Sequence, residues 1–386
     1  MRIGIDCRLY GTRHRGIGRY AEELVLALAK RSDGHRYTLF VAGEVADALS
    51  LDPSRFTVVR ADVPHYGIAE HLAMPGLIRR ARVDLMHFTH FNVPYWCPAP
   101  YIVTIHDLIA FHFPHERATT LPLWQYRLKV RGFNRVLRNA VKKARAVIAV
   151  SEFVKRDMVR HLGVPEEKVA VVHLGVEQML LGTDVMRNTP QFDRLLSETF
   201  GIAKQYLLYV GSAYPHKNLE KLIDAYALLR ARHGRNWQLV LAGRTDAFYE
   251  RVRAYADSRL AESDVRSDVI FTGEVSESML DGLYRSAKCF VFPSRYEGFG
   301  LPALEAAARG VSVVCAKAGS LPEVMADAAE YVDPESSQDI ADTISRVAGS
   351  HKVADALASL GRERAKRFTW EKTAQHTVDV YNRIMV

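Results

Sequence analysis

The chain has 386 residues, which is long for one hydrophobic core and suits two domains of about 150 to 200 residues each. Its 48% hydrophobic content is typical of folded globular domains, and 52 Lys and Arg residues against 44 Asp and Glu residues give a formal net charge of +8. This modest positive charge suits phosphorylated substrates or anionic lipid. Because no zinc-finger spacing, RNP motif or lysine-rich tail accompanies it, we expect no nucleic-acid partner.

The cysteines and the apolar runs indicate the cellular compartment of the protein. The four cysteines are widely spaced, without a CxxC pair or a zinc-like cluster, which is typical of buried thiols in a reducing cytoplasm. Residues 1–6 predict a strand rather than a signal peptide, and no apolar run approaches the roughly 18 residues that span a bilayer. We therefore expect a cytoplasmic protein that is soluble or peripheral on the inner face of the cell membrane.

The first part of the chain alternates apolar strands with amphipathic helices, the pattern of an α/β domain with a mostly parallel sheet. Strands are predicted at residues 1–6, 37–41, 56–60, 85–88, 101–106, 146–150 and 169–172.

A glycine-rich turn, Gly16-Ile17-Gly18, lies between the first strand and a long helix. Such turns bind phosphate in many folds. The spacing of Gly11, Gly16 and Gly18 differs from the G-x-G-x-x-G fingerprint, which argues against an NAD site. We expect a phosphate-binding loop that includes Arg15, with a solvated basic loop as the alternative.

His106 ends the predicted strand at residues 101–106, where parallel α/β sheets bind their ligands. We expect it to be a functional residue, with a purely structural histidine as the alternative. Asp107 is expected to cap the following turn and is not placed among the catalytic residues.

Residues 125–145 predict a helix with one cationic face beside an apolar stripe. The cationic positions are Arg127, Arg131, Arg135, Arg138 and Lys142. The apolar positions are Tyr126, Val130, Phe133, Leu137 and Val141. A solvated face over a core-facing stripe explains this pattern, and a docking surface for anionic lipid or a lipid-diphosphate acceptor is the sharper hypothesis.

Residues 178–199 break the alternation with Gly182, Asn188 and Pro190, so we interpret them as an interdomain connection. A second series of strands follows at residues 206–211, 238–243, 269–272, 289–293 and 311–315. Residues 367–386 predict an amphipathic C-terminal helix.

Lys217 lies in a basic loop between the strand at residues 206–211 and a helix predicted from Glu220. At the amino end of a helix, a cation and backbone amides can share a diphosphate. The alternative is a surface lysine near a helix start.

Two glutamates lie eight positions apart in the segment SRYEGFGLPALE, which follows the strand at residues 289–293. Glu297 lies on the loop, and Glu305 lies about one turn inside a helix that begins near Pro302. Gly298 and Gly300 let backbone amides approach an anion, and the helix adds its positive end. A diphosphate and two hydroxyl-rich groups would fit here. For an isolated pair, a solvated loop charge and an ordinary first-turn glutamate would be the alternative.

The E-x7-E spacing with its internal GFGLPALEA resembles the donor-site motif of retaining glycosyltransferases of family four, which have the GT-B fold. The resemblance implies two Rossmann-like domains facing across a cleft. Residues 1–177 would form an acceptor domain, residues 200–366 a nucleotide-sugar donor domain, and residues 367–386 a helix that returns to the first domain.

The resemblance also implies roles for single residues. Glu305 would hydrogen-bond the ribose hydroxyls of a nucleotide sugar, Glu297 would position the sugar, and Lys217 would neutralise the leaving diphosphate. His106 would contact the donor sugar's hydroxyls. The other donor-binding positions would be Gly211, Ser212, His216, Arg244, Gly298, Phe299, Gly300 and Leu301.

The chain departs from the family at Ser212 and His216, where many members carry an arginine. This departure weakens the two-cation clamp that the resemblance implies, and a protonated His216 or Arg244 could serve as the second cation. The family places the loop around Gly16-Ile17-Gly18 beside the diphosphate and the acceptor. Its arginines Arg13, Arg15 and Arg19 would suit a phosphate-bearing acceptor.

The motifs YVGSAYPHKNL and EGFGLPALEA look most like those of bacterial GDP-mannose-dependent mannosyltransferases of O-antigen or exopolysaccharide assembly. That resemblance implies a lipid-linked or oligosaccharide acceptor. A UDP-sugar-dependent transferase, a sugar-nucleotide epimerase of the same fold and a non-catalytic nucleotide-sugar-binding subunit stay open. No separate nucleophilic carboxylate is evident, which favours front-face transfer with retention. No cofactor or metal requirement is predicted, because no DxD-type motif stands at a strand end with suitable neighbours.

Overall fold

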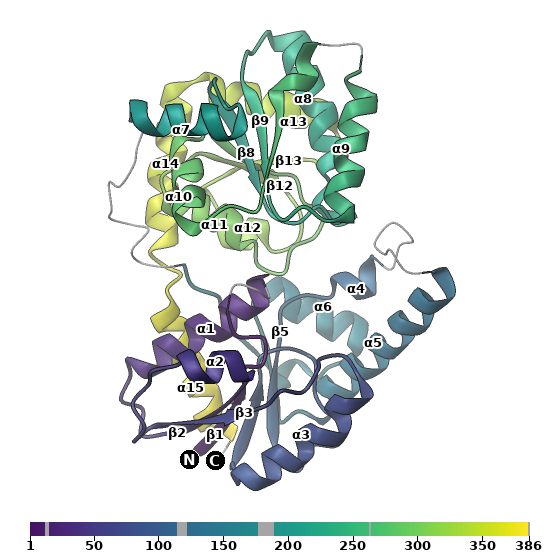
Figure 1. Ribbon diagram of the computed structural model, residues 1–386, viewed down its shortest axis with the longest axis vertical. Coiled ribbons are helices and arrows are strands. Elements are labelled where there is room, and N and C mark those ends of the chain that lie inside the picture. Colours follow the sequence, from purple (N-terminus) through teal and green to yellow (C-terminus); the bar gives the residue numbers. More distant parts are fainter. Residues whose placement is uncertain (12–14, 114–121, 177–188, 262–263, 385–386) are drawn as a thin grey trace. The chain divides into compact units, whose positions relative to one another are not determined.

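The structure, a computed structural model, describes residues 1–11, 15–113, 122–176, 189–261 and 264–384. Contacts within the chain divide it into two compact units, each with a parallel sheet and flanking helices (Figure 1). Unit 1 contains the described residues up to Gly175 together with Thr369–Val386, and unit 2 contains Val176–Phe368. The chain therefore passes from unit 1 into unit 2 and back.

In the described part of unit 1, seven parallel strands form one sheet in the order β3-β2-β1-β4-β5-β6-β7. Every position of β4 and β5 is buried, as expected for a parallel sheet covered on both faces. The strands are β1 (Arg2–Asp6), β2 (Arg36–Val41), β3 (Phe56–Arg60), β4 (Leu85–Phe88), β5 (Tyr101–Ile105), β6 (Ala146–Ala149) and β7 (Val169–Val171). The helices are α1 (Arg15–Ala29), α2 (Gly43–Ala48), α3 (Ile68–Ala81), α4 (Ile109–His112), α5 (Leu123–Lys143), α6 (Glu152–Leu162), the 3-10 turn η3 (Glu166–Lys168) and α15 (Trp370–Ile384).

The last helix, α15, packs against α1 and β6 within unit 1. The hydroxyl of Tyr381 lies 2.7 Å from Nδ1 of His87, and both side chains are fully buried. Gly175 packs so tightly on α15 that an added Cβ would lie 2.3 Å from the backbone nitrogen of Trp370. The predicted return of the C-terminal helix to the first domain is confirmed.

Among the described residues of unit 2, six parallel strands form a sheet in the order β10-β9-β8-β11-β12-β13. The strands are β8 (Tyr206–Val210), β9 (Gln238–Ala242), β10 (Val269–Gly273), β11 (Cys289–Phe292), β12 (Val313–Ala316) and β13 (Glu330–Val332). The helices are α7 (Pro190–Phe200), α8 (Leu219–His233), α9 (Ala247–Arg259), α10 (Glu277–Ser286), α11 (Leu301–Ala308), α12 (Leu321–Met325), α13 (Ser337–Gly349) and α14 (His351–Ala365), with 3-10 turns η5 (Pro215–Lys217) and η6 (Asp264–Asp268).

Helix α7 corrects the expectation that residues 178–199 are all interdomain connection. Thr189 caps the helix by accepting from the backbone N–H of Phe192 at 3.2 Å, and Pro190 occupies the first turn. Phe192 is 3% exposed and fills the space above Gly282, where an added Cβ would lie 2.2 Å from its ring. This burial makes α7 part of unit 2. Residues 178–188 lie outside the described residues.

Candidate active site

The order of strands in unit 2 reverses between β8 and β11. From β8 the sheet continues through β9 to β10, and from β11 it continues in the other direction through β12 to β13. In parallel α/β sheets, ligands bind beyond the carboxyl ends of the strands at such a switch point. Lys217 follows β8 and Glu297 follows β11, so the topology brings these two predicted residues to that point.

Lys217 and Glu297 contact each other directly. Nζ of Lys217 donates to Oε1 of Glu297 at 2.6 Å, and the two side chains are 15% and 8% exposed. The ammonium also lies 5.4 Å from the ring centre of Phe292, the last residue of β11. A diphosphate that reached Lys217 would compete with Glu297 for the same largely buried cation.

Neighbouring loops hold this pair in place. Asn218, with a left-handed φ of +66°, donates from its side-chain amide to the carbonyl oxygen of Pro293 at 3.1 Å. Ser320 donates to the Glu297 carbonyl oxygen from its backbone N–H at 3.1 Å and from its hydroxyl at 3.0 Å. Gly319 has a φ of +61°, and an added Cβ would lie 2.7 Å from the backbone of Glu297, so a side chain at this position would displace the loop.

Helix α11 begins directly after the glycine turn, with Pro302 in its first turn as predicted. Gly300 has a φ of +90°, and an added Cβ would lie 2.6 Å from the side chain of Leu321. Phe299 is buried and packs against Phe368, with ring centres 5.7 Å apart. Gly298 and Leu301 complete the turn, so all four predicted positions lie at the positive end of α11.

Glu305 is 7% exposed and belongs to a polar cluster inside unit 2. The hydroxyl of Tyr284, on α10, donates to Oε2 of Glu305 at 3.3 Å. Arg309 lies over the Tyr284 ring at 4.6 Å, donates to the Glu305 carbonyl oxygen at 3.1 Å and pairs with Asp281 at 2.8 Å. Tyr284 was not predicted from the sequence, although it orients the carboxylate that the family resemblance places at the ribose.

Burial of His216 disfavours it as the second cation of the donor site. Its side chain is buried, and burial lowers its pKa to about 3, with the neighbouring charge of Lys217 acting in the same direction. The imidazole is therefore neutral near pH 7, which argues against a protonated His216. Arg244 is exposed on the turn after β9, so it stays a candidate for that cation.

The turn at Gly211 and Ser212 is held by two tyrosine hydroxyls. Tyr209 donates to the carbonyl oxygen of Ser212 at 2.7 Å, and Tyr249 donates to that of Gly211 at 2.8 Å. An added Cβ on Gly243 would lie 2.1 Å from the Gly211 carbonyl oxygen, so the backbones after β8 and β9 are closely packed. Neither tyrosine was predicted in this role: Tyr209 lies in β8 and bonds to the turn after its own strand, whereas Tyr249 reaches the turn from α9.

In unit 1, Gly16, Ile17 and Gly18 form the first turn of α1, which begins at Arg15. An added Cβ on Gly16 would meet nothing within 4 Å. Arg13 and the side chain of Arg15 lie outside the described residues, so their expected phosphate contacts stay predictions. Arg19 lies near Glu23, with Nε and Oε1 4.0 Å apart.

His106 directly follows β5, as predicted. Its Nε2 donates to the carbonyl oxygen of Thr89 at 2.9 Å, which assigns the proton to that nitrogen. Burial lowers the pKa of His106 to about 4, and Tyr20 packs edge-on against the ring at 4.8 Å. The side chain is thus a neutral, oriented hydrogen-bonding group, in line with a positioning role.

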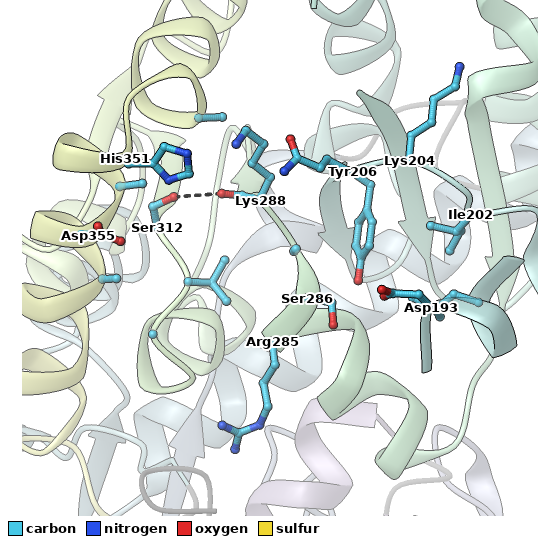
Figure 2. A pocket seen from close by; sticks show the side chains of 18 of the residues that line it. Asp193, Ile202, Lys204, Tyr206, Arg285, Ser286, Lys288, Ser312, His351 and Asp355 are labelled. Carbon is cyan, nitrogen blue, oxygen red and sulfur yellow. Dashed lines mark hydrogen bonds between the residues drawn. The ribbon is translucent and has the colours of Figure 1, made fainter. Parts of the chain in front are cut away.

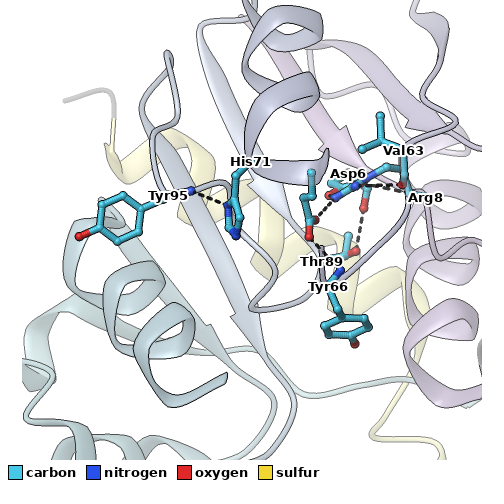
Figure 3. Close-up of polar contacts among 8 residues, drawn as sticks. Asp6, Arg8, Val63, Tyr66, His71, Thr89 and Tyr95 are labelled. Atoms are coloured by element: carbon cyan, nitrogen blue, oxygen red, sulfur yellow. Dashed lines mark hydrogen bonds and ion pairs between the residues drawn. The ribbon is translucent and has the colours of Figure 1, made fainter. Parts of the chain in front are cut away.

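A buried ion network that the sequence did not predict lies at the carboxyl end of β1 (Figure 3). Arg8 donates to both carboxylate oxygens of Asp6, at 2.8 and 2.7 Å, and to Glu70 at 2.5 Å. Glu70 also accepts from the backbone N–H of Tyr66 at 3.1 Å, and Thr89 donates to the Asp6 carbonyl oxygen at 2.7 Å. These contacts fasten the segment before α3 to the ends of β1 and β4.

Two family models match the chain on either side of residues 179–196. The model of Glycosyltransferase Family 4 matches residues 14–178, and that of Glycosyl transferases group 1 matches residues 197–364. The chain is a family-four glycosyltransferase. The predicted family is confirmed.

Among the relatives of this glycosyltransferase is O-antigen chain mannosyltransferase B of Escherichia coli, 28% identical over 382 residues that cover 95% of each chain. Sucrose-phosphate synthase of Thermosynechococcus elongatus has the same fold, with a TM-score of 0.74 at 20% identity over 100% of this chain and 99% of that one. HepE of Anabaena in complex with UDP-glucose superposes with a TM-score of 0.73 at 19% identity, over 99% and 100% of the two chains. The predicted GT-B fold is confirmed.

The glycosyltransferase also has a cavity of about 760 Å³ at the amino ends of the strands in the unit 2 sheet (Figure 2). Tyr206 begins β8, while Lys288 and Ser312 directly precede β11 and β12, and all three line the cavity. The hydroxyl of Ser312 donates to the Lys288 carbonyl oxygen at 3.4 Å. The cavity lies at the amino ends of the strands and is therefore distinct from the site around Lys217 and Glu297.

On α5 of the glycosyltransferase, all five predicted cationic side chains are exposed. The apolar stripe is buried only toward the end of the helix, where Leu137 and Val141 are 1% and 2% exposed. Near its start, Trp124 and Leu128 are 64% and 57% exposed. No helix in the described part of the chain combines the length and apolarity that crossing a membrane requires.

Proposed function

We propose that this glycosyltransferase is a retaining mannosyltransferase that transfers mannose from GDP-mannose to a lipid-linked or polysaccharide acceptor in bacterial surface-glycan synthesis. The observation that carries the proposal is the contact between Lys217 and Glu297 at the switch point of unit 2. The choice of sugar is supported by the name of the relative from Escherichia coli, which matches nearly the whole chain. In this proposal, unit 2 binds the donor and unit 1 binds the acceptor.

The leaving group decides what the donor site must do. Departure of the nucleoside diphosphate breaks the bond between the anomeric carbon and a phosphate oxygen, and leaves negative charge on the diphosphate. Lys217 and the first amides of α11 would stabilise that charge, a kind of interaction that is stronger in the transition state than in the ground state. Glu297, released from Lys217, would accept hydrogen bonds from the sugar's hydroxyls.

Retention follows if the acceptor attacks from the face that the diphosphate leaves. The acceptor hydroxyl oxygen then forms the new bond to the anomeric carbon, and its proton passes to the departing phosphate oxygen. The neutral His106, with Nε2–H already directed to Thr89, is suited to orient a hydroxyl without adding charge. Glu305, oriented by Tyr284, would accept from the ribose hydroxyls.

Nucleotide binding and product analysis test this proposal. The full chain would be heated with GDP, UDP, dTDP, ADP or NAD at matched concentrations, where a ligand at about 100 times its dissociation constant stabilises by about 2.7 kcal/mol. We expect a shift with GDP and turnover of GDP-mannose, with an α-linked product in NMR spectra. A shift with UDP or ADP instead would discard the mannosyl donor, and a β-linked product would discard retention.

We further propose that α5 docks the enzyme on an anionic membrane or on a lipid-diphosphate acceptor. The exposed cationic face and the exposed Trp124 and Leu128 support this, because cations attract anionic lipid and an aromatic side chain suits the membrane interface. Sedimentation with phosphatidylglycerol vesicles would compare the wild type with a variant in which Arg131, Arg135 and Arg138 are all changed to Glu. We expect the wild type to sediment and the variant to stay in solution, and equal sedimentation would contradict the docking.

A further inference from the structure

Three potential metal ligands gather in unit 1 on the two helices α4 and α6. Among the residues that the structure describes, His112, Asp157 and His161 form a set whose ligand atoms all lie within 4.8 Å of one another. None of the three belongs to the donor-site motif or to the glycine turn. Two imidazoles and one carboxylate are a donor set that suits Zn²⁺ and related transition metals.

The local sequence accounts for the arrangement. Asp157 and His161 are four residues apart on α6, so their side chains lie on one face of that helix. Ser151 caps α6 by accepting from the backbone N–H of Val154 at 3.1 Å, which defines where the helix begins. His112 is the last residue of α4 and reaches the same carboxylate from the other side.

The histidine–carboxylate distances are close to those of a metal site. Nε2 of His112 lies 2.9 and 2.8 Å from the two carboxylate oxygens of Asp157, and Nε2 of His161 lies 3.5 Å from one of them. Bonds of about 2.0–2.2 Å in a tetrahedron place ligand atoms about 3.3–3.6 Å apart. The histidine–carboxylate separations thus differ from the requirement by about half an ångström or less.

Burial and packing restrict the three side chains. Asp157 is 8% exposed, while the side chains of His112 and His161 are 24% and 33% exposed, so solvent reaches the imidazoles but hardly the carboxylate. The two imidazole rings meet edge to face at 4.9 Å, and Phe111 packs against His161 at 5.9 Å. A metal would therefore meet side chains that are already oriented, which lowers the entropy cost of binding.

A positive charge near the three ligands opposes the binding of a metal cation. Arg138 reaches the set from α5, because its guanidinium lies 5.7 Å from the ring centre of Phe111 and donates to the His161 carbonyl oxygen at 3.4 Å.

We propose that His112, Asp157 and His161 bind a divalent transition metal such as Zn²⁺, with the protein supplying three ligands and water the fourth. The ion would join α4 to α6. Because α4 begins three residues after His106, the metal would fix the segment that leaves β5 at the predicted active-site histidine.

Metal titrations of the full chain test the proposal. Protein prepared without a polyhistidine tag and dialysed against a chelator would be titrated with Zn²⁺ and followed by its melting temperature. A parallel titration with Co²⁺ would be followed by visible absorption, because the intensity of the d–d bands reports the coordination number. We expect one saturable site with a raised melting temperature and the intense bands of four-coordinate Co²⁺.

The variants His161→Ala and His112→Asn separate this site from adventitious binding. Each should lower Zn²⁺ affinity by at least about 100-fold, because removal of a group that only orients a metal ligand already costs 10–100-fold. The control is His233→Ala, since His233 pairs with Asp342 at 2.8 Å without a third ligand in the described set. Circular dichroism of each variant without metal would verify folding. Unchanged Zn²⁺ affinity in both ligand variants, or an equal loss in the control, would overturn the proposal.

Discussion

The two units present polar side chains at the carboxyl ends of their strands in opposite ways. In unit 2, the groups come from one short stretch after β11 and from the loop after β8, and Lys217 meets Glu297 as a charged pair. In unit 1, the corresponding groups are a neutral His106 and an ion network in which Arg8 is already matched by two carboxylates. Under the proposed function, the cation of unit 2 would leave Glu297 for an incoming diphosphate, whereas the charges of unit 1 largely hold its own loops.

The comparison predicts that Arg8 matters for stability. In Arg8→Met, Asp6 and Glu70 would remain buried without their cation, and such a loss costs about 3–5 kcal/mol. Scanning calorimetry of the full chain should show a clearly lower melting temperature. The control Arg346→Met removes an exposed pair with Glu330 and should change little. If both variants melt alike, the network of unit 1 contributes no more than a surface pair.

In unit 2, removal of the buried cation Lys217 should lower the turnover number. Under the proposed function, Lys217→Ala would remove the cation that stabilises the leaving diphosphate, and loss of one such group costs about 10²–10³ in kcat. Steady-state transfer from GDP-mannose would measure it. Lys204→Ala is a matched control, because Lys204 pairs with Asp268 at 2.8 Å but precedes β8 instead of following it. Nearly normal turnover in Lys217→Ala would remove this lysine from the mechanism.

A smaller effect is expected at Glu305. Glu305→Ala should weaken GDP binding by about 1.5–3 kcal/mol, the usual contribution of a hydrogen bond to a charged group. Calorimetric titration with GDP would measure the change, and Glu330→Ala, at the start of β13, provides a control carboxylate of the same unit. Unchanged GDP affinity in Glu305→Ala would show that the ribose binds elsewhere.

The last effect concerns acid stability, which the buried histidines of unit 1 should lower. Burial lowers the pKa of His87 to about 3 and that of His106 to about 4, against an ordinary value of 6.5. The unfolded chain therefore takes up protons that the folded chain does not, so stability present above pH 6.5 is lost as the pH falls toward 4. His87→Gln should make the fall in melting temperature between pH 6.5 and 4.5 shallower, whereas His351→Gln, at an exposed position, should not.

The sequence predicted what is local and missed what is assembled across the fold. Strand β11, the glycine turn and Glu305 lie within one continuous segment, so composition and spacing were enough to place them. The bond from Tyr284 to Glu305 joins residues 21 positions apart, and the pair of Arg8 with Glu70 joins residues 62 apart. Hydrophobic periodicity in the sequence does not reveal either of these pairs.

Two other features that the sequence did not indicate have similar causes. His216 is neutral because of burial, which depends on the packed structure and not on its neighbours in the sequence. Helix α7 was missed because glycine and asparagine precede it, although Pro190 is a first-turn signal and Phe192 and Leu196 are spaced for one buried face. Helix-breaking residues taken alone therefore overestimate the length of an interdomain connection.

Unit 1 combines an early segment of the chain with the late helix α15, and this affects how the protein folds during synthesis. A ribosome makes all of Val176–Phe368 before it makes α15, so the nascent unit 2 can fold while unit 1 still lacks the helix that covers His87. During that interval, the hydrophobic surface that α15 covers is exposed, and such surface makes a nascent chain prone to aggregation. A premature stop near residue 368 would thus damage the part of the enzyme that was translated first.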